Sequence, residues 1–182
     1  MTTSASPLDL RAFIRSIPDF PKPGIMFRDI TPLLRDGRAF SEAIRRMAEP
    51  YKKGSIDVVL GAESRGFLFA AGIALALGAG VVPVRKKGKL PAATTSVTYD
   101  LEYGTDTLEM HTDAVTRGTR VLMVDDLLAT GGTMAACCDM VEKAGGKILG
   151  VEFLIELEFL AGRKKLERHP VRSQIVYKDE RP

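Results

Sequence analysis

The sequence predicts an α/β protein with a central, mainly parallel sheet flanked by helices. Two observations support this fold class. Short apolar segments alternate with segments of helical periodicity, and one of them, 120–125 (RVLMVD), is almost continuously apolar, as is typical of a strand covered on both faces. The chain has 182 residues, of which 45% are hydrophobic and 27% charged, so we expect one globular domain over 1–182.

The N-terminal part of the chain predicts a helix, an irregular loop and a second helix. Apolar residues recur at helical spacing over 8–17, and Pro18 would end this helix. Four prolines and one glycine between Pro18 and Pro32 predict an ordered but irregular loop. A further helix is expected at 39–51.

Strands and helices then alternate. We expect a strand at 56–61, a helix at 65–77 and a strand at 81–84. The 19 residues from Gly66 to Val84 carry no charge, a length close to that of a membrane span. Four glycines and one proline lower the hydrophobicity of this stretch and divide it, so a buried helix, turn and strand is the better interpretation.

The alternation is interrupted between 85 and 111. A basic run is followed by stretches rich in Thr and Tyr at 94–99 and 105–111, which indicate an antiparallel hairpin and a flexible flap. The remaining expected elements are the strand at 120–125, a helix at 132–144 and strands at 148–155 and 174–177. Ligands bind beyond the carboxyl ends of the strands in such sheets, so the loops after 60, 84 and 125 are the candidate sites.

The segment 121–134 (VLMVDDLLATGGTM) is the most informative one. Two neighbouring carboxylates, Asp125 and Asp126, can both be used only where the strand ends and the chain turns, and there they could accept hydrogen bonds from the two hydroxyls of a ribose. A loop of small residues at a helix start then offers backbone N–H groups and hydroxyls, an arrangement that binds a phosphate dianion. Its residues are Ala129, Thr130, Gly131, Gly132 and Thr133. Either dipeptide alone would be read as a cap or a tight turn, but the combination predicts a site for ribose 5-phosphate.

Composition and charge exclude several other classes of protein. A net charge of +3 is too small and too dispersed to indicate a nucleic-acid binder. Cys137 and Cys138 are adjacent, so they predict neither a disulfide nor a zinc site, and buried thiols fit a reducing compartment. The N-terminal segment MTTSASPLDLRAFIRS lacks the apolar run of a secretory signal. We therefore expect a cytoplasmic protein with no membrane partner.

The segment 121–134 resembles the phosphoribosyl-diphosphate motif of type I phosphoribosyltransferases, and above all of the members that act on adenine. The similarity covers about residues 10–170. Further segments similar to these enzymes occur in the same order, namely FPKPGIMFRDITPLL at 20–34, GAESRGFLFA at 61–70, VRKKGKLP at 84–91 and YDLEYGTDTLEM at 99–110. One departure is FAAGIA at 69–74, where relatives more often place Gly-Pro or Ala-Pro.

The resemblance implies the fold of that family, with a base-binding hood at 1–35 and a flexible flap at 85–111. It implies transfer of the 5-phosphoribosyl group from phosphoribosyl diphosphate to adenine, which gives AMP and pyrophosphate in purine salvage. Asp125 and Asp126 would hold the ribose hydroxyls and stabilise positive charge on the ring. Mg²⁺ would be bound mainly through the substrate diphosphate and water, so no protein metal ligand is expected. A homodimer is also expected.

The resemblance assigns the diphosphate to two groups of residues. Glu63, Ser64 and Arg65 would form a pyrophosphate loop, in which a cis peptide joins the first two. The basic run would supply further cations to the departing diphosphate, and its arginine could reach into the site of a partner subunit. These cations are Arg85, Lys86 and Lys89.

Adenine would bind between the hood and the flap. Phe27 would stack on the ring, while backbone groups around Ile25 and Arg28 would read the exocyclic amine. Glu102 is the candidate general base that accepts the proton lost by adenine, and Tyr103 would cover the reacting centre and exclude water.

Two other functions fit the same residues less well. A 6-oxopurine such as hypoxanthine, guanine or xanthine favours a donor, commonly a lysine, at the ring oxygen, whereas FPKPGIMFRD at 20–29 offers backbone groups. A regulator that binds phosphoribosyl diphosphate without turnover would leave Glu102 without a purpose. The sequence also has no helix-turn-helix or basic N-terminal domain that would dock on DNA.

Overall fold

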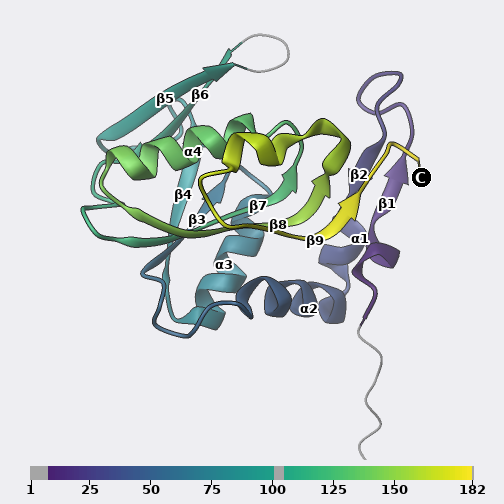
Figure 1. Cartoon of the computed structure of the whole chain (residues 1–182), viewed down its shortest axis with the longest axis horizontal. Coiled ribbons are helices and arrows are strands. Elements are labelled where there is room, and N and C mark those ends of the chain that lie inside the picture. The colour runs from purple at the N-terminus through teal and green to yellow at the C-terminus, as the bar shows by residue number, and fades with distance from the viewer. Residues whose placement is uncertain (1–7, 101–104, 182) are drawn as a thin grey trace, which may run out of the picture.

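The computed structural model describes residues 8–100 and 105–181. Its main sheet has seven strands and lies between two layers of helices (Figure 1). The strand order is β5-β6-β4-β3-β7-β8-β9. The parallel strands are β3 (Val58–Ala62), β4 (Gly80–Lys86), β7 (Arg120–Leu128), β8 (Lys147–Leu157) and β9 (Val171–Tyr177). Strands β5 (Thr94–Asp100) and β6 (Thr105–His111) form the predicted antiparallel hairpin. The predicted fold class is confirmed.

Each face of the sheet has its own buried cluster. Helices α2 (Gly37–Ala48) and α3 (Gly66–Leu77) cover one face, and α4 (Gly132–Lys143) covers the other. Strand β7 contributes to both clusters, because its buried side chains alternate between the two faces. Leu122 lies in the first cluster and Val121 in the second. A strand buried in this way has to be apolar along its length, which explains the sequence signal at 120–125.

Local signals set the helix boundaries. Asp36 caps α2 by accepting hydrogen bonds from the backbone N–H groups of Arg38 at 3.0 Å and Ala39 at 2.9 Å. Helix α3 ends at Gly78, whose φ of +69° is the left-handed conformation that favours glycine. The charge-free stretch therefore forms the predicted helix, turn and strand. Within the described ranges, no helix is both long and apolar enough to cross a membrane.

The helix predicted at 8–17 is wrong. Only a short 3-10 helix forms, at Leu10–Phe13, and Arg15–Ile17 is strand β1. Strand β1 pairs in antiparallel register with β2 (Phe27–Asp29), so the loop predicted at 18–32 is irregular only in part. A residue before proline is biased toward extended backbone, and Ile17 precedes Pro18. This bias and the pairing with β2 outweigh the helical spacing of the apolar residues.

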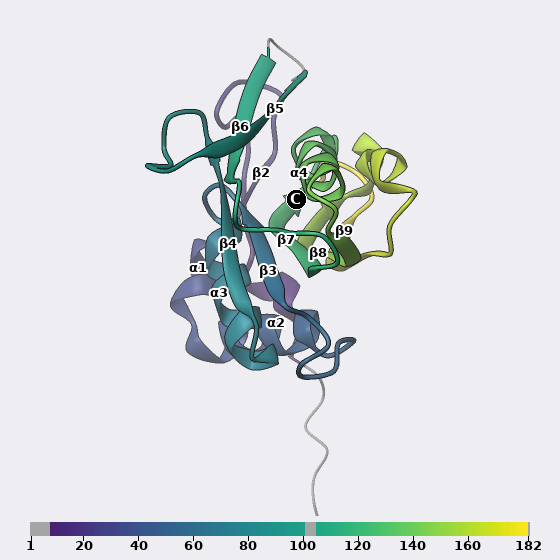
Figure 2. The same cartoon turned by 90° about the vertical axis from the view of Figure 1, so that its left-hand side faces the viewer.

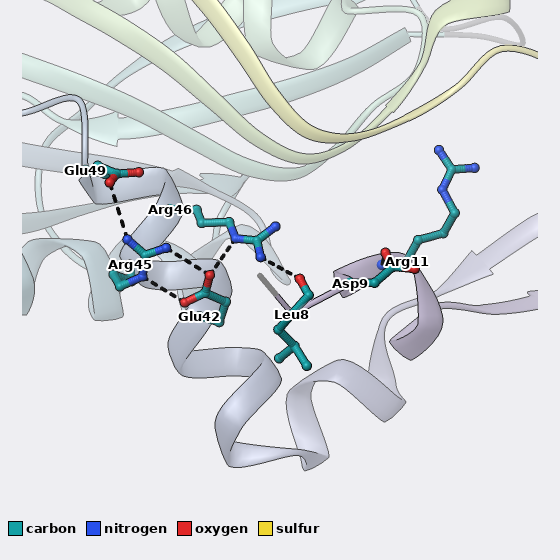
Figure 3. A network of polar contacts seen from close by, with 7 residues as sticks. All are labelled: Leu8, Asp9, Arg11, Glu42, Arg45, Arg46 and Glu49. Atoms are coloured by element: carbon teal, nitrogen blue, oxygen red, sulfur yellow. Dashed lines mark hydrogen bonds and ion pairs between the residues drawn. The ribbon is translucent and has the colours of Figure 1, made fainter. Parts of the chain in front are cut away.

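An ion-pair network fastens the N-terminal segment to α2 (Figure 3). The Glu42 carboxylate accepts hydrogen bonds from Arg45 and Arg46, and the contact from Arg46 Nε is 2.7 Å. These hydrogen bonds, with that from Arg45 the larger, lower the pKa of Glu42 to about 2. Arg46 also donates to the Leu8 carbonyl, so one guanidinium joins the start of the described chain to α2. The network thereby holds one end of the hood against the body of the fold.

Glu152 of β8 makes the stability of the fold depend on pH. Its side chain is fully buried and accepts a hydrogen bond from the Tyr51 hydroxyl at 3.0 Å, and burial raises the pKa of Glu152 to about 7. The native state therefore holds this proton more tightly than the unfolded chain. The stabilisation is complete below the unfolded pKa near 4.5 and is lost as the pH rises through about 7.

We expect Glu152→Gln to flatten this dependence, because the amide cannot ionise. Urea unfolding at pH 5 and pH 8 should show that the wild type loses roughly 2–3 kcal/mol relative to the variant over this interval. Glu167→Gln, which removes an exposed carboxyl, is the matched control. Parallel pH profiles for wild type and Glu152→Gln would contradict the prediction.

Candidate active site

A small pocket lies where β7 passes into α4. Its volume is about 80 Å³, several times the roughly 10–15 Å³ that a cavity needs to hold one water molecule, so the pocket has room for a phosphoryl-sized group. Gly131 adopts a φ of +77° at the N-cap, and no side chain within the described part of the chain caps the helix. The first N–H groups of α4 are therefore available to an anion. The lining residues are Asp125, Leu127, Leu128, Ala129, Thr130, Gly131, Gly132, Thr133, Met134 and Phe153.

The two aspartates lie within a strand and not at its end. Strand β7 continues to Leu128, so the expectation that it ends at Asp125 is wrong. The adjacent positions give the two carboxylates different partners. Asp126 accepts a hydrogen bond from Arg65 Nε at 2.6 Å, whereas Asp125 lines the pocket and accepts one from the Asp126 N–H at 2.8 Å. Burial, with the nearby charge of Asp126, raises the pKa of Asp125.

The loop after β3 carries the residues predicted for a pyrophosphate loop. A cis peptide joins Glu63 to Ser64. The Glu63 carboxylate accepts hydrogen bonds from Arg85 Nε at 3.0 Å and from the Lys86 N–H at 2.6 Å. Burial alone would raise the pKa of Glu63, but these hydrogen bonds outweigh it and lower the pKa. The loop after β3 is thus joined to the basic run, which begins with the last two residues of β4.

The flap hairpin reaches both of these regions. Figure 2 shows β5 and β6 projecting beyond the rest of the sheet. The Tyr99 hydroxyl of β5 lies 3.1 Å from the Thr133 hydroxyl in the phosphate pocket, and Asp106 of β6 lies 3.1 Å from Lys86 Nζ. Lys89 is exposed in the same basic run. Glu102 and Tyr103, the predicted base and cover, lie outside the described residues.

The hood approaches the site through Phe27. Its ring packs edge-on against Phe20, with centroids 5.0 Å apart, and lies 5.8 Å from the Arg65 guanidinium. Arg28 turns elsewhere, because its guanidinium stacks 3.9 Å above the Tyr177 ring. The Ile25 N–H donates to Lys22 O, and its carbonyl accepts from Phe20 N–H. A carbonyl has two lone pairs, so the Ile25 oxygen keeps one for a ligand, whereas its N–H is engaged.

The structure brings most of the predicted residues into one continuous set. The Phe27 ring of the hood lies beside the Arg65 guanidinium, which pairs with Asp126. The residues after Asp126, at the end of β7 and in the following loop, line the small pocket. Arg85 is joined to the same set through Glu63. The side chain of Arg28 is not part of it. An apolar ring, two arginines, two carboxylates and an uncapped helix terminus can together hold a flat base, a diol and phosphate groups.

Three residues that contact the candidate site, Tyr99, Asp106 and Gly162, were not singled out from the sequence. Tyr99 and Asp106 lie in the Thr- and Tyr-rich stretches, but those stretches indicate only a hairpin and not what it touches. Gly162 packs directly against the phosphate loop, and a Cβ on it would lie 2.1 Å from the Ala129 carbonyl oxygen. No local pattern marks this glycine, because the close approach joins segments about thirty residues apart.

The described residues offer few side chains that could bind a metal ion. Among the residues that the structure describes, no three His, Cys, Asp or Glu side chains are grouped so that they could hold a metal ion. Asp125 supplies carboxylate oxygens at the pocket, a donor type that Mg²⁺ accepts together with phosphate and water.

Comparison with known proteins identifies the family. The model of the phosphoribosyl transferase domain matches residues 30–179. An adenine phosphoribosyltransferase of Chloroflexus aurantiacus is 57% identical over 93% of this chain and 98% of its own length. The crystal structure of adenine phosphoribosyltransferase from Thermoanaerobacter pseudethanolicus is 53% identical, with a TM-score of 0.89 over 92% of this chain and 98% of that one. The enzyme from Saccharomyces cerevisiae, complexed with adenine and an imino-altritol bisphosphate, is 42% identical, with a TM-score of 0.85 over 91% and 96%. The chain therefore belongs to the phosphoribosyl transferase domain family and, within it, to the adenine phosphoribosyltransferases.

Proposed function

We propose that the chain transfers the 5-phosphoribosyl group of phosphoribosyl diphosphate to N9 of adenine, giving AMP and pyrophosphate. The observation that carries this function is the set joined by Arg65, in which a hood aromatic ring, the β7 aspartates and the uncapped α4 terminus lie side by side. The yeast relative was crystallised with adenine. Salvage of free adenine follows from the reaction.

The leaving group requires positive charge on one side of the ribose. Cleavage at the anomeric carbon develops negative charge on the diphosphate, which Arg65 and the loop Glu63–Ser64 would meet together with Arg85, Lys86 and Lys89. Glu63 holds Arg85 at 3.0 Å, which keeps this guanidinium on the pyrophosphate loop. Lys86 has its pKa raised by its hydrogen bond to Asp106 and stays cationic when the diphosphate arrives.

The ribose and its 5-phosphate occupy the β7 side of the site. The 5-phosphate would bind the N–H groups and hydroxyls of Ala129–Thr133. Asp126 would exchange Arg65 for a ribose hydroxyl, and Asp125 would accept from the neighbouring one. Their negative charge also stabilises the positive charge that develops on the ring in the transition state.

Adenine binds at the hood. Phe27 would stack on the ring, and backbone groups around Ile25 and Arg28 would contact its polar edge. Glu102 would accept the N9 proton, and Tyr103 would exclude water from the reacting centre. The hairpin that carries both residues touches the phosphate loop through Tyr99, which supports a flap that covers the site.

Mg²⁺ is part of this proposal, held mainly by the diphosphate oxygens and water. When bound, it neutralises charge on the departing diphosphate. The chain's own contribution is the orientation of that diphosphate by Arg65 and the basic run.

A homodimer is proposed from the apolar surface of α3 and β4. Leu75 is 83% exposed, and Leu68 and Val81 are also exposed. In the described strands β6 pairs with β4 only at Arg85 and Lys86, so the edge of β4 before them is open. An open edge beside apolar side chains favours burial against a second copy. Sedimentation equilibrium tests this, and a mass near 19.8 kDa would contradict it.

The cytoplasm is the proposed location. Cys137 and Cys138 are free, buried thiols, and burial raises the pKa of both, so they persist best in a reducing compartment.

A screen of purine bases tests the reaction. Purified protein is supplied with phosphoribosyl diphosphate, Mg²⁺ and one base at a time, and pyrophosphate release is measured. We expect turnover with adenine and much slower turnover with hypoxanthine, guanine and xanthine. Equal turnover of hypoxanthine would overturn the specificity, and tight binding of phosphoribosyl diphosphate without pyrophosphate release would favour a binding protein.

A further inference from the structure

A turn far along the chain packs against the back of the phosphate loop. Gly162 begins the short 3-10 helix Gly162–Leu166 between β8 and β9. A Cβ built on it would lie 2.1 Å from the Ala129 carbonyl oxygen and 2.9 Å from Gly131 N. In return, a Cβ on Gly131 would lie 2.4 Å from the Gly162 carbonyl oxygen. The two backbones are therefore in direct contact, and neither position has room for a side chain.

This contact lies behind the loop and not in its pocket. Among the described residues, those that line the pocket do not include Gly162. The Ala129 carbonyl faces Gly162, and a peptide's C=O and N–H point in opposite directions. The Thr130 N–H, which belongs to the same peptide, is thereby directed away from Gly162.

An ion pair between the exposed Arg163 and the buried Glu156 fixes the turn itself. Arg163 donates through Nε to Glu156 at 3.0 Å and through Nη1 to the Val171 carbonyl at 2.7 Å. Glu156 is 4% exposed and also accepts from the Ser173 hydroxyl at 2.6 Å. Burial alone would raise the pKa of Glu156, but its hydrogen bonds with Arg163 and Ser173 lower it, so the pair stays charged. The residue next to Gly162 is thus tied to both β8 and β9.

We propose that Gly162 and Arg163 are positioning residues for the 5-phosphate of the phosphoribosyl group. The inference rests on the proposed function, because it concerns the same phosphate site. Backbone N–H groups bind an anion well only when they already point at it, since a loop that must reorganise gives back part of the interaction. Gly162 holds the loop from behind by contact, and Arg163 holds Gly162 in place.

Gly162→Ala tests the contact. The methyl group forces the Ala129 carbonyl to move, so we expect the KM for phosphoribosyl diphosphate to rise roughly 10²-fold, as for a displacement of about 1 Å at a site. The KM for adenine should stay within about twofold, because a loop displacement of this size is local. Gly37→Ala is the matched control, because a Cβ there meets no atom within 4 Å, and it should behave as wild type.

A second pair of variants leaves the glycine in place, in case Gly162→Ala does not fold. Arg163→Gln removes the ion pair with Glu156, and we expect a rise of about tenfold in the KM for phosphoribosyl diphosphate. Arg163→Lys keeps the charge but loses the planar set of guanidinium donors, so we expect a smaller rise. Arg168→Gln is the control, since Arg168 pairs with Asp139 and Glu142 on the surface of α4. Its constants should not change.

Calorimetric titration with ribose 5-phosphate separates this inference from the proposed reaction. The dissociation constant should rise in Gly162→Ala and Arg163→Gln in parallel with the KM for phosphoribosyl diphosphate. Unchanged ribose 5-phosphate binding, or an equal rise in the KM for adenine, would overturn the positioning role. A wild type that binds ribose 5-phosphate but releases no pyrophosphate would overturn the reaction, while the titrations would still decide the role of the turn.

Discussion

Asp125→Asn combined with Asp126→Asn is expected to lower kcat/KM at least about 10³-fold, because both carboxylates act on the ring that becomes positive in the transition state. The amides still reach the ribose hydroxyls but carry no charge. The effect should therefore appear in kcat more than in the KM for phosphoribosyl diphosphate. Steady-state kinetics with adenine measure it.

The double variant should remain folded. Arg65 loses a partner, but its side chain is 44% exposed, so water can solvate the guanidinium. The two substitutions also remove the two largest causes that raise the pKa of Asp125, namely the burial of a charged carboxylate and the neighbouring charge of Asp126. Asp139→Asn on α4, where the carboxyl is half exposed, is the matched control for the same chemical change. Wild-type turnover in the double variant, with unchanged melting temperature, would contradict the assignment of the diol.

Glu102→Gln is expected to lower kcat by roughly 10²–10⁴-fold, the range for loss of a general base. Glutamine preserves the size of the side chain, so substrate binding should change little and the KM values should stay close to wild type. The acidic limb of the pH–rate profile should also disappear, because protonation of this carboxyl no longer limits the rate. Initial rates from pH 5 to pH 9 measure both effects.

Two controls define this result. Glu167→Gln makes the same change at an exposed position and should leave rate and profile unaltered. Tyr99→Phe removes the hairpin's hydroxyl contact to Thr133 without altering the base, so its profile should keep the acidic limb. An unchanged kcat in Glu102→Gln would remove this residue from the mechanism.

The sheet could be predicted because its strands carry their own signal. Strands β3, β7 and β8 are largely buried and carry mainly apolar side chains on both faces, so they can be recognised without knowing their neighbours. The helix predicted at 8–17 could not be excluded from the local sequence. Its apolar spacing fits a helix, and what decides against it is the pairing of 15–17 with 27–29, which local periodicity does not report.

The segments proposed to bind the phosphate and the diphosphate could be recognised from the sequence for a similar reason. Each is a contiguous segment in which strand, loop and helix start follow one another, as at 125–133. The base-binding part depends on contacts between distant segments. Arg28 turns toward Tyr177 of β9, and Ile25 uses its N–H within the hood loop, and neither feature is encoded next to the residue concerned.

With the roles proposed here, the Arg65–Asp126 pair makes substrate recognition an exchange of partners. In the structure, the cation proposed to bind the diphosphate is paired with the anion proposed to bind the ribose. A molecule that offers only a diphosphate, or only a diol, would separate Arg65 from Asp126 and leave one of these two side chains without a partner. A molecule that carries both compensates both at once, so affinity rises more than the sum of its halves.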